Sequence, residues 1–366
     1  MDWLDDKDKI IEGAFAECYL KMHPMICIHG ILFTIDGIVS DESGIKNDIY
    51  SMVRPYVTSG LARKVEQLLQ TIKLEAYSEP LPLQTDRIHV ANGTLFLNGE
   101  FSEQKDFCLN RLPVIYDPDV EKPARWLKFM EELLNPDDIL TLQEYMGYML
   151  LPTTKAQKMM LIIGKGGEGK SRIGLVLREL FGNNMYSCSL QKIEVDKFAR
   201  ANLEYMLITV DDDMKLEALP QTNHIKSIVT LEDQIDLERK GQQSFQGVVY
   251  ARLIAFGNGG LHALYDKTDG FYRRQLILTT KDKVDGREDD PYLIDKLRKE
   301  RDGIFLWALE GLQRLVSNNY VFTESVDAKQ NLVDAQEEGN NILAFMKSEG
   351  YLHTSLHRYY KNPLMK

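Results

Sequence analysis

The sequence has few of the features that mark membrane, secreted or fibrous proteins. Its main apolar run near the middle, Met159–Ile163, is far shorter than the ~20 residues that a membrane-spanning helix needs. The start, MDWLDDKDKI, lacks the apolar core of a secretory signal. The four cysteines contain no C-x-x-C pair, which argues against a zinc site and favours free thiols in a reducing compartment. We therefore expect a cytoplasmic protein with no membrane partner.

Positive charge is also scarce, because 44 Lys and Arg stand against 55 Asp and Glu in 366 residues, giving a net charge of −11. This balance argues against a general nucleic-acid coat, although a few basic residues could still line one channel. No segment repeats with the period of a solenoid. The length is sufficient for two or three domains, each with its own core.

Hydrophobic spacing divides the chain into a mixed first part and a more regular second part. The first part combines helical spacing over 10–22 and 59–74, a strand-like piece over 30–38, and Asn-Gly turn signals at 92–93 and 98–99. The segment YDPDVEKP at 116–123 has the composition of a linker.

The second part begins with a segment from Trp126 to Leu151 whose apolar residues have helical spacing. Leu127, Met130, Leu133 and Leu134 would form one apolar face of the helix. Four short apolar runs follow, some of them separated by helical text: Met159–Ile163, Tyr205–Val210, Arg252–Phe256 and Gln275–Thr280. This alternation predicts an α/β domain with a largely parallel, buried sheet. Helical text returns at 293–315, and the last fifty residues have the pattern of a small separate helical module.

The text LIIGKGGEGKSRIG contains the pattern G-x-x-x-x-G-K-S, which is typical of a phosphate-binding loop. Glycines let backbone N–H groups approach an anion closely, and the helix that follows directs its positive end at the anion. Lys170 would supply a charge to the terminal phosphates, and the Ser171 hydroxyl could ligate Mg²⁺. The glycines expected to bind the nucleotide are Gly164, Gly166, Gly167 and Gly169. The pattern therefore predicts ATP and Mg²⁺ as ligands.

Three carboxylates, Asp211, Asp212 and Asp213, directly follow the apolar run YMLITV. At the end of a neighbouring strand, Asp211 would hold Mg²⁺ through its water shell, and Asp212 would orient or deprotonate the attacking water. The alternative is a solvated acidic loop. Three adjacent carboxylates repel one another unless a cation neutralises them, so the metal site is the preferred interpretation.

Two further features would complete an ATPase. Asn258 follows the run 252–256, where its amide could hold the attacking water or the γ-phosphate. Arg273 and Arg274 precede the run QLILTT and could stabilise charge on a transferred phosphoryl group, including one bound to a neighbouring subunit. Taken alone, an Asn in a turn is usually only a turn residue and an arginine pair is usually a surface feature.

The order of these motifs resembles that of superfamily 3 helicases, which are AAA+ proteins. It is most similar to the helicase part of phage and plasmid primase–helicases and of the poxvirus primase–helicase. The resemblance covers roughly residues 81–315 and is carried by the P-loop and by NRLPVIYDPD (110–119), LQEYMGYML (142–150), GFYRRQLIL (270–278) and ERDGIFLWALEGLQRL (300–315). Gly257 replaces the usual Thr before the sensor Asn, and Tyr272 stands where Trp is commoner, but neither change removes a catalytic group.

The resemblance implies an AAA+ core and a role for each motif. Asp211 and Asp212 would be the Walker B pair, and Asn258 would be sensor 1. Arg274 aligns best as the arginine finger that acts on a neighbouring subunit, with Arg273 as the alternate.

Two other segments also match the family. LERKGQQSFQ (237–246) resembles the DNA-contacting hairpin of papillomavirus-type helicases, with Arg239 and Lys240 at its tip. ILAFMKSEGYLHTSLHRYYKNP (342–363) resembles the start of a winged helix, reduced or incomplete. About 80 residues precede the match, too few for a primase domain, so primer synthesis is not expected. The predicted domains are 1–120, an α+β region and candidate oligomerisation collar, 121–316, the ATPase, and 317–366, a small C-terminal module.

Together these features predict an ATP-dependent, ring-forming DNA helicase, hexameric by resemblance, for a phage, plasmid or genomic island in a bacterial cytoplasm. It would translocate on single-stranded or forked DNA and could work beside a separate primase or initiator. One alternative is an ATP-switched origin initiator or helicase loader without processive unwinding. Another is a small-molecule kinase, which would need a lid and an acceptor pocket but no basic hairpin.

Overall fold

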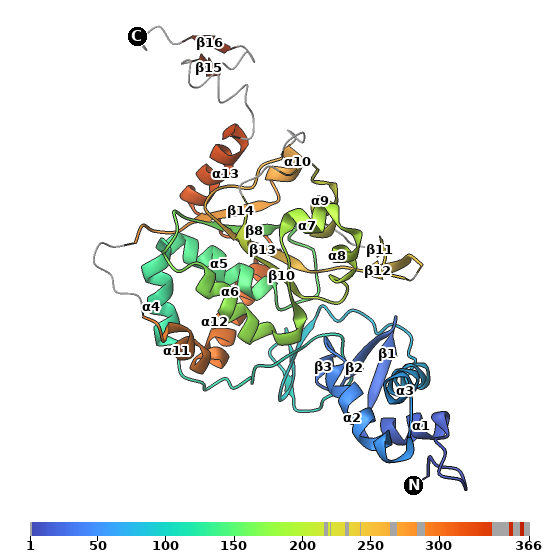
Figure 1. Cartoon of the computed structure of the whole chain (residues 1–366). Helices are drawn as coiled ribbons and strands as arrows, with labels where there is room; N and C mark the ends of the chain where they lie inside the picture. Colours follow the sequence, from blue (N-terminus) through green and yellow to red (C-terminus); the bar gives the residue numbers. More distant parts are fainter. Residues whose placement is uncertain are drawn as a thin grey trace. The chain divides into compact units, whose positions relative to one another are not determined.

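The computed structural model describes residues 2–215, 219, 221–230, 234–241, 243–263, 269–283, 290–338, 351–353 and 359–361. The chain divides into two compact units, residues 1–116 with 182–184 and residues 117–181 with 185–366 (Figure 1). The division follows Tyr116, and residues 117–123 of the predicted linker are neither helix nor strand. The three-domain division with boundaries near 120 and 316 stays a prediction.

The first unit combines helices with two small sheets. One sheet has the order β1-β2-β3 and is antiparallel, and the other has the order β6-β5-β4-β7, with only β4 and β7 parallel. The elements are α1 (Glu12–Met22), β1 (Met25–Ile28), β2 (Ile31–Thr34), β3 (Gly37–Ile38), α2 (Ser43–Val53), η1 (Arg54–Tyr56), α3 (Leu61–Glu75), β4 (Arg87–Val90), β5 (Gly93–Phe96), β6 (Phe101–Ser102), β7 (Arg111–Leu112) and η2 (Gly182–Asn184).

The helical and Asn-Gly signals in this unit are confirmed, whereas the strand-like piece predicted over 30–38 forms two strands, β2 and β3, joined by a turn at 35–36. Helix α3 buries Val65, Leu68, Leu69 and Ile72 along one face, in a core shared with α1, α2, β1 and β2. The Asn92-Gly93 signal lies at the turn between β4 and β5, where Val90 pairs with Gly93. The second signal lies between β5 and β6, where Gly99 has φ +92°, a conformation that glycine adopts without strain.

His89 is expected to make the stability of this unit depend on pH. Its ring contacts Gln84 and lies 2.9 Å from Thr94 Oγ1. Burial, reinforced by the charges of Arg111 and Arg87, lowers the pKa of His89 to about 4. A lowered histidine pKa means that the folded state disfavours the protonated ring, so stability is complete above about pH 6.5, the ordinary value, and falls as the pH drops toward 4.

We expect His89→Gln to flatten this loss of stability in acid. The change should be seen as a smaller fall in the Tm of unfolding between pH 7.5 and pH 4.5 than in the unchanged protein. His23→Gln is the matched control, because His23 is exposed and should leave the acid dependence as it was. If His89→Gln showed the same fall in Tm between pH 7.5 and pH 4.5 as the unchanged protein, other groups would be responsible for the loss of stability in acid.

The second unit is an α/β structure. Its elements are α4 (Ala124–Leu133), α5 (Pro136–Tyr148), β8 (Met159–Ile163), α6 (Ser171–Phe181), β9 (Met185–Ser187), α7 (Leu190–Val195), α8 (Lys197–Ala201), β10 (Ile208–Met214), α9 (Asn223–Thr230), β11 (Gln234–Leu237), β12 (Phe245–Val248), β13 (Arg252–Gly257), α10 (Asp269–Tyr272), β14 (Gln275–Thr279), α11 (Leu293–Lys299), α12 (Arg301–Ser317), α13 (Val326–Glu338), β15 (Tyr351–His353) and β16 (Tyr359–Lys361). Strands β15 and β16 pair antiparallel within the predicted winged-helix segment, whose other residues lie outside the described ones.

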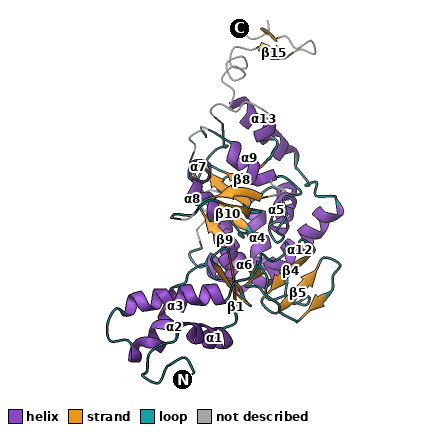
Figure 2. Ribbon diagram, turned by 90° about the vertical axis from the view of Figure 1, so that its right-hand side faces the viewer, coloured by secondary structure: helices purple, strands orange, loops and turns teal. Residues whose placement is uncertain are grey.

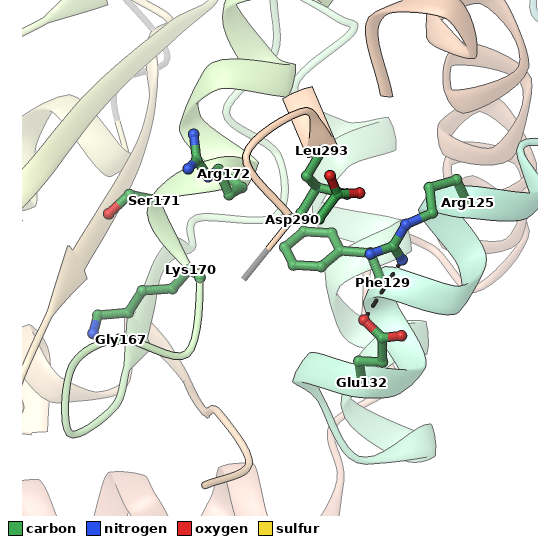
Figure 3. A pocket seen from close by; sticks show the side chains of 10 residues that line it. Arg125, Phe129, Glu132, Gly167, Lys170, Ser171, Arg172, Asp290 and Leu293 are labelled. Carbon is green, nitrogen blue, oxygen red and sulfur yellow. Dashed lines mark ion pairs between the residues drawn. The ribbon is translucent and has the colours of Figure 1, made fainter. Parts of the chain in front are cut away.

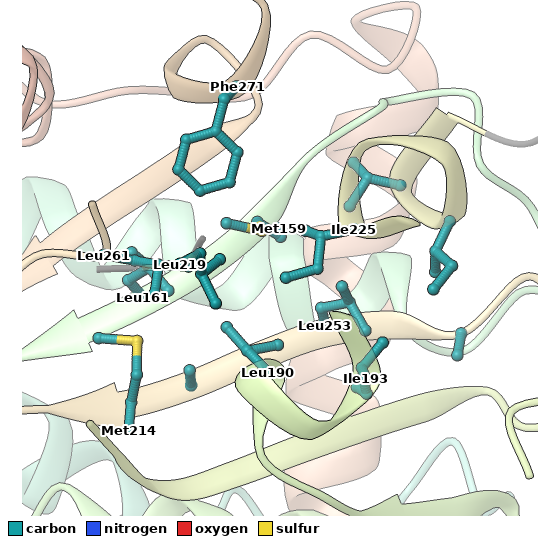
Figure 4. Packing of buried hydrophobic residues seen from close by; sticks show 14 of the residues in the cluster. Met159, Leu161, Leu190, Ile193, Met214, Leu219, Ile225, Leu253, Leu261 and Phe271 are labelled. Carbon is teal, nitrogen blue, oxygen red and sulfur yellow. The ribbon is translucent and has the colours of Figure 1, made fainter. Parts of the chain in front are cut away.

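A five-stranded parallel sheet organises this unit, in the order β14-β8-β13-β10-β9. The predicted parallel, buried sheet is therefore confirmed. One face carries Met159, Leu161, Leu253 and Ala255 into a core with residues of α7, α9 and α13 (Figure 4). The opposite face meets α6, where a Cβ on Gly174 would lie 3.3 Å from Phe256. Figure 2 shows helices on both sides of the strands, the arrangement that a sheet buried on both faces requires.

Two details of the sequence interpretation are corrected. The strand predicted at Tyr205–Val210 begins later, at Ile208, and continues to Met214, so the three aspartates lie inside it rather than after it. A β-bulge between Asp211 and Met214 shifts the register of β10 against β13. The bulge explains why the adjacent side chains of Asp212 and Asp213 can both face solvent. In α4 the buried stripe includes Trp126 and Phe129, whereas Leu127 is half-buried.

Helices α5 and α12 form a close pair within the second unit. A Cβ on Gly147 would lie 2.4 Å from the carbonyl oxygen of Ala308, and one on Gly311 would lie 2.2 Å from that of Gln143. Only glycine permits backbones to approach this closely.

Among the helices of the described residues, none combines the length and apolar character needed to cross a bilayer.

Candidate nucleotide-binding site

The loop between β8 and α6 has the backbone shape of a phosphate-binding loop. Gly166, Gly167 and Gly169 have φ values of +110°, +85° and +105°, in the left-handed region that favours glycine. Gly164 is required for space, since a Cβ there would lie 2.1 Å from Oγ1 of Thr280. The loop leads into Ser171, the first residue of α6. The N-terminus of that helix therefore faces the position where an anion would bind.

Lys170 is held inside this loop by two polar groups. Its Nζ lies 3.0 Å from Oδ1 of Asn258 and 3.3 Å from Oε2 of Glu168, and the residue is only 8% exposed. Asn258 reaches the lysine because β13 pairs with β8, with Gly257 opposite Ile163. Two predicted site residues that are 88 positions apart in sequence are thereby in direct contact.

Glu168 is a part of the site that the sequence interpretation missed. It is buried, and Oε1 accepts a hydrogen bond of 2.6 Å from the Gly166 N–H. Burial alone would raise the pKa of this carboxyl, but hydrogen bonds from backbone N–H groups and the charge of Lys170 outweigh it and lower the pKa. A triphosphate would compete with this carboxylate for Lys170. The only sequence signal was an acidic residue inside a glycine-rich loop.

Asp211 and Asp212 lie at the carboxyl edge of the same sheet. Asp211 is 4% exposed and accepts a hydrogen bond of 2.9 Å from the Leu190 N–H, whereas Asp212 is exposed. Burial raises the pKa of the Asp211 carboxyl, and the charge of Asp213 raises it further. The pKa of Asp212 is also raised, by partial desolvation of its carboxyl group although much of the side chain is exposed, and by the charge of Asp213. A bound cation would relieve this penalty on their ionised forms.

The residues present fit a nucleotide with its magnesium ion. Glycine φ values, a buried lysine and the carboxylates of β10 supply the donors and acceptors that phosphates and Mg²⁺ prefer. Within the described ranges, no group of three or more His, Cys, Asp and Glu side chains could hold a metal ion by itself. Magnesium ions at nucleotide sites are commonly bound by one or two carboxylates together with substrate phosphates.

A pocket of about 350 Å³ opens beside the P-loop. Its far wall is formed by α4, with Arg125, Phe129 and Glu132, and Asp290 and Leu293 close another side (Figure 3). Its volume is within the range of small-molecule sites. The Arg125 Nη1 lies 3.5 Å from Oε2 of Glu132, so the wall presents an ion pair beside an aromatic ring. Sequence reasoning did not find these residues because they come from segments far from the P-loop.

The predicted basic hairpin exists, but its two cations differ. Strands β11 and β12 are antiparallel, Leu237 pairs with Phe245, and Gly241 in the connection has φ +78°. Lys240 is exposed. Arg239 instead forms an ion pair with Glu204, and only 21% of its side chain is exposed. Both cations lie in the connection between the strands, as predicted, but the guanidinium of Arg239 is directed at a buried carboxylate. A DNA contact of either residue stays a prediction.

The arginine pair lies at the amino ends of the sheet strands, whereas the P-loop lies at their carboxyl ends. Arg273 and Arg274 precede β14, whose first residue, Gln275, pairs with Met159 at the start of β8, whereas the P-loop follows the end of β8. A five-residue strand separates the two edges by ~16 Å. Arg273 is exposed, and Arg274 is half-buried with its Nη1 donating to the Gly270 carbonyl. Neither arginine is placed to serve the P-loop of its own chain.

Comparisons with known proteins agree with this fold. A family of unknown function (DUF5906) matches residues 162–274, from the end of β8 to the arginine pair. An apo A-form structure of the C-terminal region of NrS-1 is similar at 11% identity and a TM-score of 0.59, covering 92% of this chain and 76% of that one.

A second apo structure of the NrS-1 C-terminal region gives 12% identity, the same TM-score of 0.59, and coverage of 92% and 77%. The JCV helicase, solved with a bound small molecule, gives 14% identity at a TM-score of only 0.31. At such identities the NrS-1 structures show a shared fold, and the last likeness is too weak to support a conclusion.

Proposed function

We propose that this protein is an ATP-driven DNA helicase with an AAA+ core of the superfamily 3 type, working as a homo-oligomeric ring, most simply a hexamer. The observation that carries the proposal is the contact between Lys170 of the P-loop and Asn258 at the end of the next strand. A lysine and an amide that converge at the carboxyl edge of a parallel sheet, beside acidic residues, suit a bound triphosphate. The shared fold with the NrS-1 C-terminal region is consistent with this core.

Each residue has a role in this proposal. Lys170 and the N–H groups of the glycine loop bind the phosphates, while Ser171 and Asp211 hold Mg²⁺, which neutralises phosphate oxygens when bound. Asp212 orients the attacking water and takes its proton. Asn258 positions that water or the γ-phosphate. The pocket beside the P-loop has the size and the aromatic wall expected of a nucleoside site.

The position of the arginine pair supports the proposed ring. An arginine that stabilises the transferred phosphoryl group must reach its nucleotide, and Arg273 and Arg274 lie at the wrong edge of their own sheet. A finger at this position would act on a neighbouring copy, and each hydrolytic site would then be shared between two subunits. Of the two, exposed Arg273 is now the better candidate, whereas the sequence alignment favoured Arg274.

The proposed DNA contact is Lys240. One exposed lysine per subunit, repeated around a ring, would line a central channel with positive charge even though the whole chain carries −11. Single-stranded DNA is the expected substrate because a channel of this kind contacts the backbone of one strand. A separate primase or initiator is proposed as a partner on the family resemblance.

Two assays on one preparation test the proposal. ATP turnover should rise when single-stranded DNA is added, and a forked duplex should be unwound in the presence of ATP. Stimulation without unwinding would favour an initiator or loader that uses ATP as an assembly switch. Turnover that ignores DNA would contradict both and leave small-molecule phosphorylation as the better account of the P-loop.

Lys240→Ala should weaken single-stranded DNA binding and abolish unwinding. Removing a phosphate contact makes the negative slope of log K against log salt shallower by about 0.7 for each phosphate lost. Fluorescence anisotropy with a labelled oligonucleotide at several salt concentrations measures this slope. Lys283→Ala is a suitable control because it removes an exposed lysine outside the hairpin. An unchanged slope together with normal unwinding would place Lys240 outside the channel.

A further inference from the structure

The base of the β11–β12 hairpin is tied to the segment that leads into β10. Leu237 is buried in the core of the second unit, and Phe245, its partner across the hairpin, packs against the same core. Beyond this last pair the chain makes the connection that carries Glu238, Arg239 and Lys240. Packing therefore holds the paired strands in place. The connection beyond Leu237 and Phe245 is held by a different contact.

Arg239 is held by a buried acid. Its guanidinium pairs with Glu204, whose side chain is fully buried, and lies 4.8 Å from the centre of the Phe245 ring. Glu204 also reaches the other hairpin strand, because a Cβ on Gly247 would lie 3.1 Å from its Oε1. Tyr205 also forms a side-chain hydrogen bond with Glu204, but a neutral hydroxyl does not supply the positive charge of Arg239. Moving Arg239 to a DNA phosphate would therefore leave the buried carboxylate without its ion pair. Arg239 is therefore unsuited to the DNA contact that its position in the sequence implied.

Glu204 lies close in sequence to the hydrolytic residues. It is in the turn between α8 and β10, four residues before β10 begins, and β10 carries Asp211 and Asp212 at its other end. A hydrogen-bonded strand in the middle of a sheet is a stiff element. A shift of β10 at the nucleotide would therefore be passed to Glu204 and, through the ion pair, to the connection that holds Lys240.

We propose that the Arg239–Glu204 ion pair is a positioning device that couples the hairpin to β10, leaving Lys240 as the DNA contact. The inference rests on the proposed helicase function, because it names how that function's ATP site and DNA site communicate. The two adjacent cations then have different roles: Lys240 contacts DNA, and Arg239 holds the connection in place through Glu204.

The deciding variant is Glu204→Gln, which removes the buried charge and leaves both cations of the hairpin in place. DNA stimulation of ATP turnover should fall by about tenfold, a common size for the coupling between two sites. The salt slope of single-stranded DNA binding should stay unchanged, because no phosphate contact is lost. Arg239→Gln should reproduce both results, and the double variant should be no worse than either single one, since all three break the same pair.

Lys197→Met provides the matched control. Lys197 pairs with Glu238, the hairpin residue next to Arg239, at 2.6 Å, but both side chains are substantially exposed, so this pair should contribute little. The control should keep its DNA stimulation and its salt slope. Thermal unfolding of every variant checks the fold. If Arg239→Gln does not fold, the DNA stimulation and the salt slope of Glu204→Gln are compared with those of Arg239→Lys.

Three results would overturn the inference. Normal DNA stimulation in Glu204→Gln would show that the pair transmits nothing. A reduced salt slope in Arg239→Gln, of the kind expected for Lys240→Ala, with normal behaviour in Glu204→Gln, would make Arg239 a DNA contact. A wild-type protein that neither binds DNA nor responds to it would overturn the proposed function and this coupling with it, and that failure is recognised without any variant.

Discussion

Lys170→Ala is expected to reduce ATP turnover by about 10²–10³-fold, the usual effect of removing one preorganised charged or hydrogen-bonding group from a reacting centre. Lys170 is buried in the loop, in contact with Asn258 and Glu168. Its charge would act on the terminal phosphates, where negative charge shifts during transfer. Steady-state phosphate release at saturating ATP and Mg²⁺ measures the loss. Turnover close to that of the unchanged protein would contradict the assignment of the P-loop.

The controls separate chemistry from folding. Lys165 belongs to the same loop but is 80% exposed and paired with Asp282 at 2.8 Å, so Lys165→Ala should retain most of the activity. Lys170→Ala removes a cation from the buried Glu168 carboxylate, which should lower the Tm. Adding Glu168→Gln should restore the Tm but not the turnover. A double variant that regained activity would mean that Lys170 serves only to neutralise Glu168.

Arg273→Ala is expected to reduce ATP turnover by about 10³-fold or more, the scale reported for arginine fingers in phosphoryl transfer, while nucleotide still binds. The side chain of Arg273 is exposed, and in the proposed ring it would be the one to reach a neighbouring subunit. Arg274 donates to the Gly270 carbonyl of α10, so Arg274→Ala should act mainly by loosening that corner and should lower the Tm. Binding of a fluorescent ATP analogue and phosphate release measure the two effects separately.

Mixed rings test whether the arginine acts on another copy. Arg273→Ala subunits keep Asp212 and lack the finger, while Asp212→Asn subunits keep the finger and lack the acid. Some junctions in a mixture should pair an intact Asp212 with an intact Arg273, so activity should exceed that of either variant alone. No recovery at any ratio, with mixed rings demonstrated by differently tagged subunits, would exclude a finger that acts between subunits. Recovery with Arg274→Ala and not with Arg273→Ala would restore the original assignment.

The sequence by itself determined the elements whose signals are local. The run Met159–Ile163 became β8, the glycines of the following loop have the left-handed φ values that their pattern predicts, and Ile173, Val176, Leu177 and Leu180 are buried along α6. These features depend on hydrophobic period and on the backbone freedom of single residues, which neighbouring positions in the sequence already define.

The sequence also placed Asn258, although only as the residue after a strand. What brings it to Lys170 is the insertion of β13 between β8 and β10, an order that differs from the order along the chain. Strand neighbours are chosen by packing between segments far apart in sequence, so local patterns do not reveal them. The aspartates illustrate the same limit, because the bulge in β10 depends on its pairing with β13.

Only the tertiary structure distinguished chemically similar neighbours. Arg239 and Lys240 are adjacent cations, yet one is directed at the buried Glu204 and the other is exposed. Arg273 and Arg274 differ in the same way, and Glu168 lies inside the loop rather than in solvent. Residue type determines what a side chain can do. Its direction depends on the backbone that carries it and on the groups that other segments bring to it, and the burial of those groups determines whether its charge is available to a ligand.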